Sequence, residues 1–404
     1  MAYKIRTRDE HLLNDGSPKR ILALDGGGLR GILTLSYLAE IESALRERHG
    51  GSKDFRLSHY FDLIAGTSTG SIIAAALARG MAVADIIKKY NDLGQRVFQK
   101  SWLRQGYVRA FYDEAGLIKE LKDVYGPDTT MGDPSLQTGL LVITKRLDSG
   151  SPWPISNNPR GRYFGVRPNQ SVVANSQYPL WQVVRASTAA PRYFDPERIV
   201  ITQGSGEQKS VQGEFVDGGV SPFNNPALQA VMYATFDGYR IGWSTGADKL
   251  MVVSIGTGSR DPKTAPASLA MENALKAVIS VMDDCADLME ILLQWMSSSH
   301  TARVIDREMG DLRHDSIAPA PLINYLRYNI TLSKESLTPP RHRFAGRQIR
   351  KPERHGRSRQ HANVARYRRA GGKAASPRRG FFVEFRSHKL GPSGGLGASI
   401  LRRC

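Results

Sequence analysis

Short apolar runs alternate with longer stretches of helical spacing over the first 340 residues of the chain. The apolar runs predict buried strands at 20–25, 61–67, 140–144, 214–219 and 249–258, with a closing strand at 324–332. Apolar residues three and four positions apart predict helices at 32–48, 71–78, 83–98, 178–191 and 225–236. Because uninterrupted apolar strands are buried on both faces, we expect an α/β fold: an open, mainly parallel sheet with helices on both faces.

A regular apolar stripe with alternating spacings of four and three predicts one further helix, over 271–296. Its members are Met271, Leu275, Val278, Met282, Cys285, Met289, Leu292 and Met296. A helix packed on the domain core and a seam between paired helices both fit this spacing. A methionine-rich face also suits acyl chains, so the sequence leaves the role of this helix open.

The composition fits a globular protein without disulfides or a membrane span. The 404 residues suit one large domain or two of ordinary size, and 41% of them are apolar. Cys285 and Cys404 lie far apart and no zinc-type Cys/His cluster occurs, so we expect a reducing, cytoplasmic setting and no metal. Residues 1–18 lack the apolar core of a signal peptide, and no run of 18 apolar residues predicts a membrane span.

The net charge of +18 is concentrated at the C-terminal end of the chain. Residues 341–404 carry 18 Lys and Arg against 2 Asp and Glu, whereas residues 1–340 carry 38 against 36. We therefore divide the chain into a polar lead-in at 1–19, a domain at 20–335 and a basic tail at 341–404, which we expect to be disordered. A basic arm for anionic lipid or nucleic acid, an inert tail and an out-of-frame translation product are three interpretations of the tail.

The segment DGGGLRG, at 25–31, contains the G-x-G-x-x-G spacing of a dinucleotide-binding loop. Such a loop needs an acidic residue at the end of the next strand, where it binds the ribose hydroxyls. The next predicted strand ends in Gly66 and Thr67, and its acid, Asp62, lies at the start. No Lys-Ser or Lys-Thr pair follows Gly31, so a nucleoside-triphosphate loop is also excluded. The glycines indicate an anion site, but not one for a dinucleotide cofactor.

The second predicted strand ends in GTSTG, which is G-x-S-x-G with Ser68 between Gly66 and Gly70. A sharp strand–turn–helix elbow strains its central residue, and small neighbours relieve the clashes. The Ser68 hydroxyl would then lie at a helix N-terminus, which favours developing negative charge. A glycine-rich turn in which the serine only caps the helix would have the same sequence pattern. The motif alone therefore does not distinguish a nucleophile from a helix cap.

A serine nucleophile needs a base, and the sequence offers two kinds. In the Ser…Asp…His order of an α/β-hydrolase, His300 and His314 are the reasonable candidates, and both lie in polar stretches. A carboxylate is the alternative, because EFVDGG at 214–219 places Asp217 at the end of a predicted strand. In a parallel sheet Asp217, Ser68 and the glycine loop would share the strand carboxyl ends, where such sheets bind ligands.

If the reaction is acyl transfer, the glycine loop would stabilise the negative charge that forms on the substrate. The tetrahedral intermediate of that reaction carries an oxyanion, which preorganised N–H donors stabilise. Gly26, Gly27 and Gly28 let the backbone point successive N–H groups at one spot, and Arg30 adds positive charge nearby. We therefore expect the loop to hold the oxyanion of a reacting ester rather than a pyrophosphate.

Three blocks in this order, DGGGLRG, GTSTG and DGG, resemble the signature of the patatin-like phospholipase family. The segments VVRASTAAPRYFDP at 183–196 and GGVSPFNNPA at 218–227 are similar to further blocks of that family. The resemblance extends from about Arg20 to Leu332 and leaves out the basic tail. DGG stands where some members have DGA, a change that we expect to be harmless.

The resemblance implies a single catalytic domain of modified α/β-hydrolase type that cleaves fatty-acyl esters of lipids without a metal or cofactor. It implies a catalytic dyad of Ser68 and Asp217, with an oxyanion hole formed by Gly26, Gly27, Gly28 and Arg30. The remaining glycines of the matched motifs are Gly31, Gly66, Gly70, Gly218 and Gly219.

The implied partners are a lipid or phospholipid substrate and, transiently, a membrane surface. No specific nucleic acid is expected, and the oligomeric state is open. Two alternatives remain at this point. One is an esterase with a Ser-His-Asp triad, and the other is a non-enzymatic protein that binds membranes or nucleic acid through its basic tail.

Overall fold

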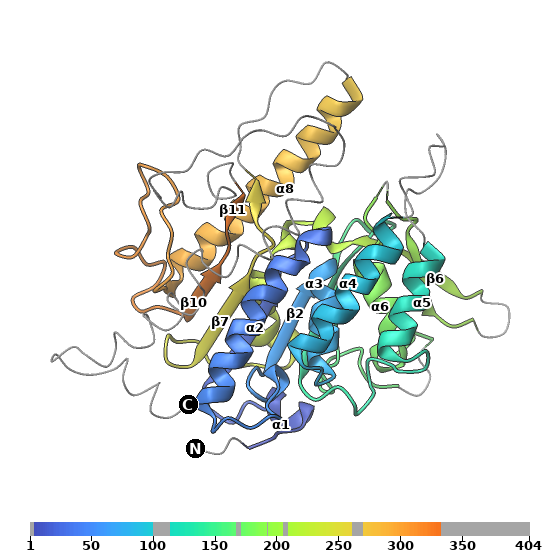
Figure 1. Cartoon of the computed structure of the whole chain (residues 1–404), viewed down its shortest axis with the longest axis horizontal. Helices are drawn as coiled ribbons and strands as arrows, with labels where there is room; N and C mark the ends of the chain where they lie inside the picture. Colours follow the sequence, from blue (N-terminus) through green and yellow to red (C-terminus); the bar gives the residue numbers. More distant parts are fainter. Residues whose placement is uncertain are drawn as a thin grey trace, which may run out of the picture. The chain divides into compact units, whose positions relative to one another are not determined.

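A sheet of nine strands runs through the part of the chain that the computed structural model describes, which is residues 4–99, 114–166, 171–191, 193–204, 209–260 and 270–332 (Figure 1). The predicted basic tail at 341–404 lies outside these residues. The strands are β1 (Lys19–Leu24), β2 (Leu63–Thr67), β3 (Gly139–Arg146), β4 (Pro152–Ser156), β5 (Glu197–Thr202), β6 (Val211–Asp217), β7 (Leu250–Ile255), β9 (Ser297–Ser298) and β10 (Ile323–Tyr328). Their order is β5-β6-β3-β2-β1-β7-β10-β9, and β4 pairs with β3 beside this path.

The sheet is mainly parallel, as the sequence predicts. Strands β3, β2, β1, β7, β10 and β9 run in the same direction. By contrast, β4 and β6 pair antiparallel with β3, and β5 pairs antiparallel with β6. The parallel direction expected for the strand at 214–219 is therefore wrong. Strands β5 and β6 follow each other in the sequence and pair antiparallel, as neighbouring strands of a hairpin can. Of the two, β6 lies next to β3 and runs antiparallel to it.

Helices cover both faces of this sheet. The layer in front of the sheet in Figure 1 contains α2 (Gly31–Arg48), α3 (Thr69–Ala78), α4 (Val83–Gln99), α5 (Glu114–Tyr125) and α6 (Leu180–Ser187). On the other face α7 (Ala227–Thr235) packs against β1, β2 and β7. The two-layered covering explains why the central strands are apolar without interruption.

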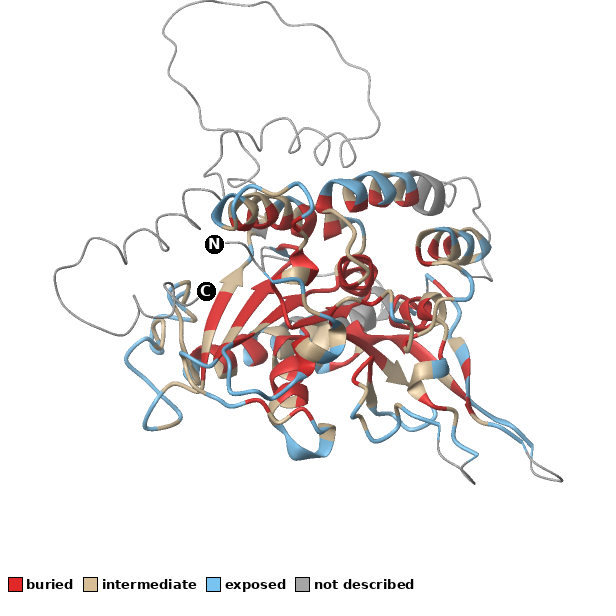
Figure 2. Ribbon diagram, turned by 90° about the horizontal axis from the view of Figure 1, so that it is seen from below, coloured by how far each residue is buried: buried red, intermediate tan, exposed pale blue. Residues whose placement is uncertain are grey.

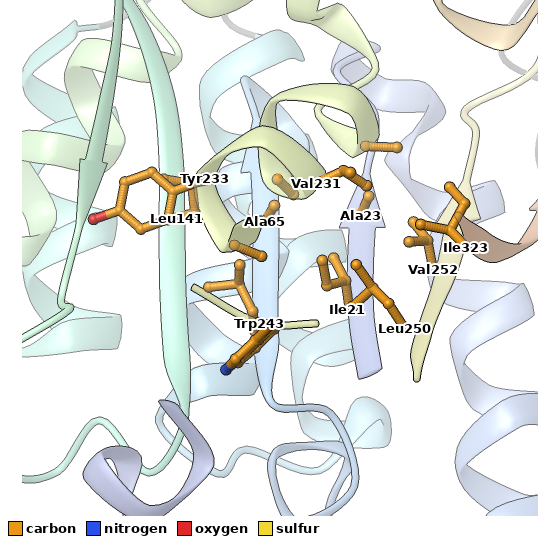
Figure 3. Close-up of a cluster of buried hydrophobic side chains, with 14 of the residues drawn as sticks. Ile21, Ala23, Ala65, Leu141, Val231, Tyr233, Trp243, Leu250, Val252 and Ile323 are labelled. Atoms are coloured by element: carbon orange, nitrogen blue, oxygen red, sulfur yellow. The ribbon is translucent and has the colours of Figure 1, made fainter. Parts of the chain in front are cut away.

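Alternate residues of neighbouring strands form the core beneath α7 (Figure 3). Ile21 and Ala23 of β1 lie beside Ala65 of β2 and Leu141 of β3, and all four are fully buried. Because successive strand residues point to opposite faces, the residues between them pack against the other helix layer. Figure 2 shows the result: the central strands are buried, whereas the helices expose their outer sides.

The predicted polar lead-in contains a helix, α1 (Arg8–Leu12), that packs on the domain. Thr7 and Glu10 form a capping box at its start, a local signal that the sequence carries. His11 and Leu12 are buried, and His11 Nδ1 lies 2.8 Å from Oδ1 of Asp62, the residue before β2. This segment is therefore part of the domain.

The stripe at 271–296 forms the predicted helix, α8 (Ala270–Trp295). Within its second half, Met289 and Leu293 are buried against the domain, which favours core packing there. Val281 and Leu288 are exposed, so the apolar surface of α8 is wider than the face that packs.

Other boundaries differ from the expectation. The helix predicted at 178–191 is shorter in the structure, where α6 spans Leu180–Ser187. Beyond its end, the Ala189 carbonyl accepts a hydrogen bond from Asp217 N at the end of β6. Helix α5 and strands β4 and β5 were not predicted. Strands β8 (Ser259–Arg260) and β11 (Thr331–Leu332) pair in parallel and belong to a second compact unit.

Candidate active site

Ser68 lies at a sharp turn between β2 and α3. Its backbone has φ 53° and ψ −128°, a left-handed conformation that is strained for a residue with a side chain. A Cβ at Gly66 would lie 2.4 Å from the Gly70 oxygen, and a Cβ at Gly70 would lie 2.2 Å from the Leu24 oxygen. Both flanking positions therefore require glycine, because the turn folds back onto β1 and onto itself.

Neighbouring side chains hold the backbone of this turn. Ser68 N donates a 2.9 Å hydrogen bond to Ser187 Oγ, which in turn donates to the Ile143 carbonyl at 2.6 Å. Ser71 Oγ donates to the Ser68 carbonyl at 2.6 Å. These bonds from α6 and α3 offset the cost of the strained conformation and present the Ser68 hydroxyl at the start of α3.

Strand pairing places Asp217 beside Ser68. In the parallel pair of β2 and β3, Thr67 is opposite Ile143, and in the antiparallel pair of β3 and β6, Thr144 is opposite Asp217. One residue beyond β2, Ser68 is therefore level with Asp217. The Ser68 Oγ donates a hydrogen bond of 2.5 Å to Asp217 Oδ2.

Burial makes Asp217 a stronger base than an exposed aspartate. Only 5% of the residue is exposed, and desolvation raises the pKa of Asp217 to about 6, opposed by hydrogen bonds from Ser68 and Gly219. Gly219 N donates to Asp217 Oδ1 at 2.7 Å, which fixes the carboxylate. A Cβ at Gly218 would lie 2.3 Å from the Ile143 oxygen, so glycine is required for β6 to approach β3 here.

The glycine loop lies against the serine turn. A Cβ at Gly26 would come within 3.0 Å of Ser68 Cβ. Gly26 N donates to the Asn224 carbonyl at 3.1 Å, so this N–H is already occupied. Among the described residues, no acceptor takes the N–H of Gly27 or Gly28, and both residues are partly exposed. Of the three expected backbone donors, the geometry therefore leaves Gly27 and Gly28.

Arg30 contacts the backbone of the glycine loop. Arg30 N and Arg30 Nε lie 3.2 Å and 3.4 Å from the Gly27 carbonyl oxygen. A Cβ at Gly31 would lie 2.3 Å from Tyr90 Oη, so glycine at 31 makes room for the Tyr90 side chain. Arg30 thus supports the loop backbone, and its direct contact with an oxyanion stays a prediction.

The two histidines of the alternative triad differ from this pair in burial. His300 and His314 are exposed, whereas Ser68 and Asp217 are buried. Within the described chain, the Ser68 hydroxyl donates to Asp217 Oδ2, and the other carboxylate oxygen of Asp217 accepts from Gly219 N. The geometry therefore favours a carboxylate base.

Some supporting residues were not singled out from the sequence. Ser187 and Asn224 lie inside the two further blocks at 183–196 and 218–227, which are the signal that could have found them. Arg327 on β10 lies in no motif, yet its guanidinium binds both carboxylate oxygens of Asp25, at 2.7 and 2.9 Å, before the glycine loop. Only the pairing of β10 with β7 brings Arg327 to this position.

The family model of the patatin-like phospholipases matches residues 22–231, just over half of the chain. This protein therefore belongs to the patatin-like phospholipase family. The matched segment contains the serine turn, the glycine loop and Asp217, and it ends within α7.

The chain is similar to two bacterial proteins named cGAMP-activated phospholipase. The Escherichia coli protein is 28% identical over 255 residues, which are 62% of this chain and 65% of the relative. The Vibrio cholerae protein is 28% identical over 360 residues, 81% of this chain and 93% of the relative. The chain thus spans just under two thirds of the first relative's length.

A solved structure, VipD from Legionella pneumophila, resembles the fold at 13% identity and a TM-score of 0.33, over 80% of this chain and 64% of that chain. That likeness is too distant to inform the function.

Among the described helices, none combines the length and the hydropathy that a bilayer crossing requires.

Proposed function

We propose that this protein is a lipid acyl hydrolase that cleaves fatty-acyl esters, with Ser68 as nucleophile and Asp217 as base. The observation that carries the proposal is the 2.5 Å hydrogen bond between Ser68 Oγ and Asp217 Oδ2 at a strained, glycine-flanked elbow. Membership of the family and the phospholipase names of its relatives support lipid esters as the substrate class.

In the first half of the reaction, Asp217 accepts the proton of Ser68 Oγ as that oxygen attacks the ester carbonyl. The N–H groups of Gly27 and Gly28 stabilise the oxyanion that forms. When the tetrahedral intermediate collapses, the ester bond breaks and the proton on Asp217 passes to the leaving alcohol or lysolipid. Ser68 then carries the acyl group.

In the second half, Asp217 takes a proton from a water molecule, whose oxygen attacks the acyl-Ser68 carbonyl. The intermediate collapses to the free fatty acid, and the proton returns to Ser68 Oγ. A pKa of about 6 suits both halves, because Asp217 is ionised at pH 7 and is still a stronger base than an exposed carboxylate.

The test is fatty-acid release from a panel of phospholipids and from short-chain esters by wild type and Ser68→Ala. We expect Ser68→Ala to lose on the order of 10³-fold or more in kcat. Ser36→Ala is the matched control, since Ser36 Oγ is exposed and donates to a carbonyl within α2. Because two relatives are named as cGAMP-activated, each assay is run with and without cGAMP. Equal turnover by wild type and Ser68→Ala would falsify the proposal.

The non-enzymatic alternative depends on the basic tail. Removing 341–404 separates the two functions, because we expect hydrolysis to survive and any binding to anionic vesicles or nucleic acid to disappear. Binding through the tail should also fall steeply with salt. A tail-deleted protein that is folded but has lost all esterase activity would contradict a catalytic domain confined to 20–335.

A further inference from the structure

The carbonyl oxygens of Gly26, Gly27 and Gly28 each accept a hydrogen bond, two of them from side chains outside the loop. The donors are Thr257 Oγ1 to Gly26 O at 2.9 Å, Arg30 N to Gly27 O at 3.2 Å, and Tyr90 Oη to Gly28 O at 2.6 Å. In a trans peptide, a carbonyl and the N–H of the next residue point in opposite directions. A donor that fixes one carbonyl therefore also fixes the direction of the following N–H.

Thr257 controls the peptide that ends in the Gly27 N–H. Its hydroxyl holds the Gly26 carbonyl on one side, so the Gly27 N–H points away from Thr257. The same carbonyl is contacted from a second direction, because Asn224 Nδ2 lies 3.5 Å from the Gly26 oxygen. The preceding peptide is also held, since Gly26 N donates to the Asn224 carbonyl. The rotation of the Gly26–Gly27 peptide thus depends on Thr257 and Asn224.

The fit between Thr257 and Gly27 is close. A Cβ at Gly27 would lie 2.1 Å from Thr257 Oγ1 and 2.5 Å from Thr257 Cβ. Glycine is therefore required at position 27, because any side chain there would clash with Thr257 where it packs on the loop backbone. Thr257 is 4% exposed, so its hydrogen bond to the loop is buried and largely shielded from bulk water. It follows β7 and lies outside the segment 22–231 that the family model matches.

We propose that Thr257 is a positioning residue that aims the Gly27 N–H at the oxyanion of the reacting ester. The proposal rests on the proposed function, since it assigns a supporting residue to that same site. Without the hydroxyl, the Gly26–Gly27 peptide loses a bond that resists rotation, and one oxyanion donor is less well aligned. The effect falls on the transition state, in which the oxyanion exists, and not on substrate binding.

The experiment compares Thr257→Val, which removes the hydroxyl at similar size, with Thr257→Ser, which keeps it. Thr138→Val is the matched control: Thr138 is fully buried and donates its hydroxyl to the Phe61 carbonyl at 2.6 Å, before β3. We expect Thr257→Val to lower kcat about tenfold with KM unchanged, less than the 10²–10³-fold for deleting a donor. Thr257→Ser and Thr138→Val should stay within about twofold of wild type.

A second readout is inhibition by a trifluoromethyl ketone, whose adduct with Ser68 carries an oxyanion. The inhibition constant should rise in Thr257→Val by the same factor by which kcat/KM falls. If Thr257→Val does not fold, Thr257→Ala removes the same hydroxyl without placing a methyl group against the carbonyl. An unchanged kcat in a folded variant, or an equal loss in Thr138→Val, overturns the proposal.

Amide hydrogen exchange of the peptide 25–31 provides a readout that needs no substrate. We expect faster exchange in Thr257→Val and unchanged exchange in Thr138→Val, because only the first variant releases the loop. Unchanged exchange in both variants overturns the positioning role. Failure of the proposed function is recognised separately, by hydrolysis in Ser68→Ala at the wild-type rate.

Discussion

Arg327 binds Asp25 through two parallel hydrogen bonds, from Nη1 to Oδ1 at 2.9 Å and from Nη2 to Oδ2 at 2.7 Å. Both side chains are less than a tenth exposed, so this is a buried ion pair. It joins β10 to the residue that precedes the glycine loop. Arg327 Nη1 also donates to Ser254 Oγ on β7 at 2.8 Å, which fixes the guanidinium between the two strands.

Arg327→Met leaves Asp25 buried without its partner. Burial already raises the pKa of Asp25, and Arg327 opposes that rise. We expect a loss of about 3–5 kcal/mol in the free energy of unfolding, measured by urea denaturation. Asp25→Asn in the same chain should recover part of the loss, because the uncompensated charge is gone. The control is Arg198→Met, whose pair with Glu214 is exposed and is expected to contribute less than about 1 kcal/mol. Similar losses from both arginines would contradict this account.

The pH dependence of hydrolysis should follow Asp217. Its raised pKa of about 6 means that the base is protonated, and inactive, at lower pH. We expect kcat/KM on a soluble short-chain ester to rise tenfold per pH unit below about pH 6 and to level off above it. His300→Ala and His314→Ala should keep the same profile. A profile that is flat down to pH 4, or one that either histidine variant abolishes, would rule out Asp217 as the base.

Asp217→Asn should be inactive but more stable than wild type at pH 8. The folded protein binds the Asp217 proton more tightly than the unfolded chain does, since burial raises its pKa from 3.8 to about 6. Ionisation between about pH 4 and pH 6 therefore lowers the free energy of unfolding of wild type, by roughly 3 kcal/mol for two pKa units. The asparagine avoids this cost, so its advantage should be present at pH 8 and small at pH 4. Urea unfolding at both pH values measures it, and equal stabilities at pH 8 would refute the argument.

Gly70→Ala should destabilise the domain strongly. Its Cβ would lie 2.2 Å from the Leu24 oxygen and 2.7 Å from the Asp25 oxygen, so the elbow must move away from β1. We expect a loss of at least about 2 kcal/mol in the free energy of unfolding. Gly238→Ala is the matched control, because its Cβ would meet no atom within 4 Å, and we expect a change within about 0.5 kcal/mol. Thermal unfolding of the two variants compares them, and equal midpoints would show that the elbow tolerates a side chain.

Local patterns were enough to predict most of the fold. Continuous apolar runs identified the central strands β1, β2, β3 and β7, and helical spacing identified α2, α3, α4, α7 and α8, because each pattern reflects burial of a single element. The serine turn was also predictable, because its glycines are required by contacts that are almost entirely local. A Cβ at Gly66 would clash with Gly70 in the same strand–turn–helix unit, and a Cβ at Gly70 would clash with Leu24 in the adjacent strand. The capping box of Thr7 and Glu10 is likewise a local signal for α1.

Only the tertiary structure decided which distant groups meet. The pairing registers of β2, β3 and β6 bring Asp217 to Ser68, and they do so with β6 antiparallel, contrary to the expectation. The hydrogen bond from Gly26 N to Asn224 removes one expected oxyanion donor, and Thr257 and Arg327 reach the glycine loop from β7 and β10. A residue's own neighbours in the sequence determine its local conformation. Its partners across a sheet depend on strand order and register, which arise only when the whole core packs.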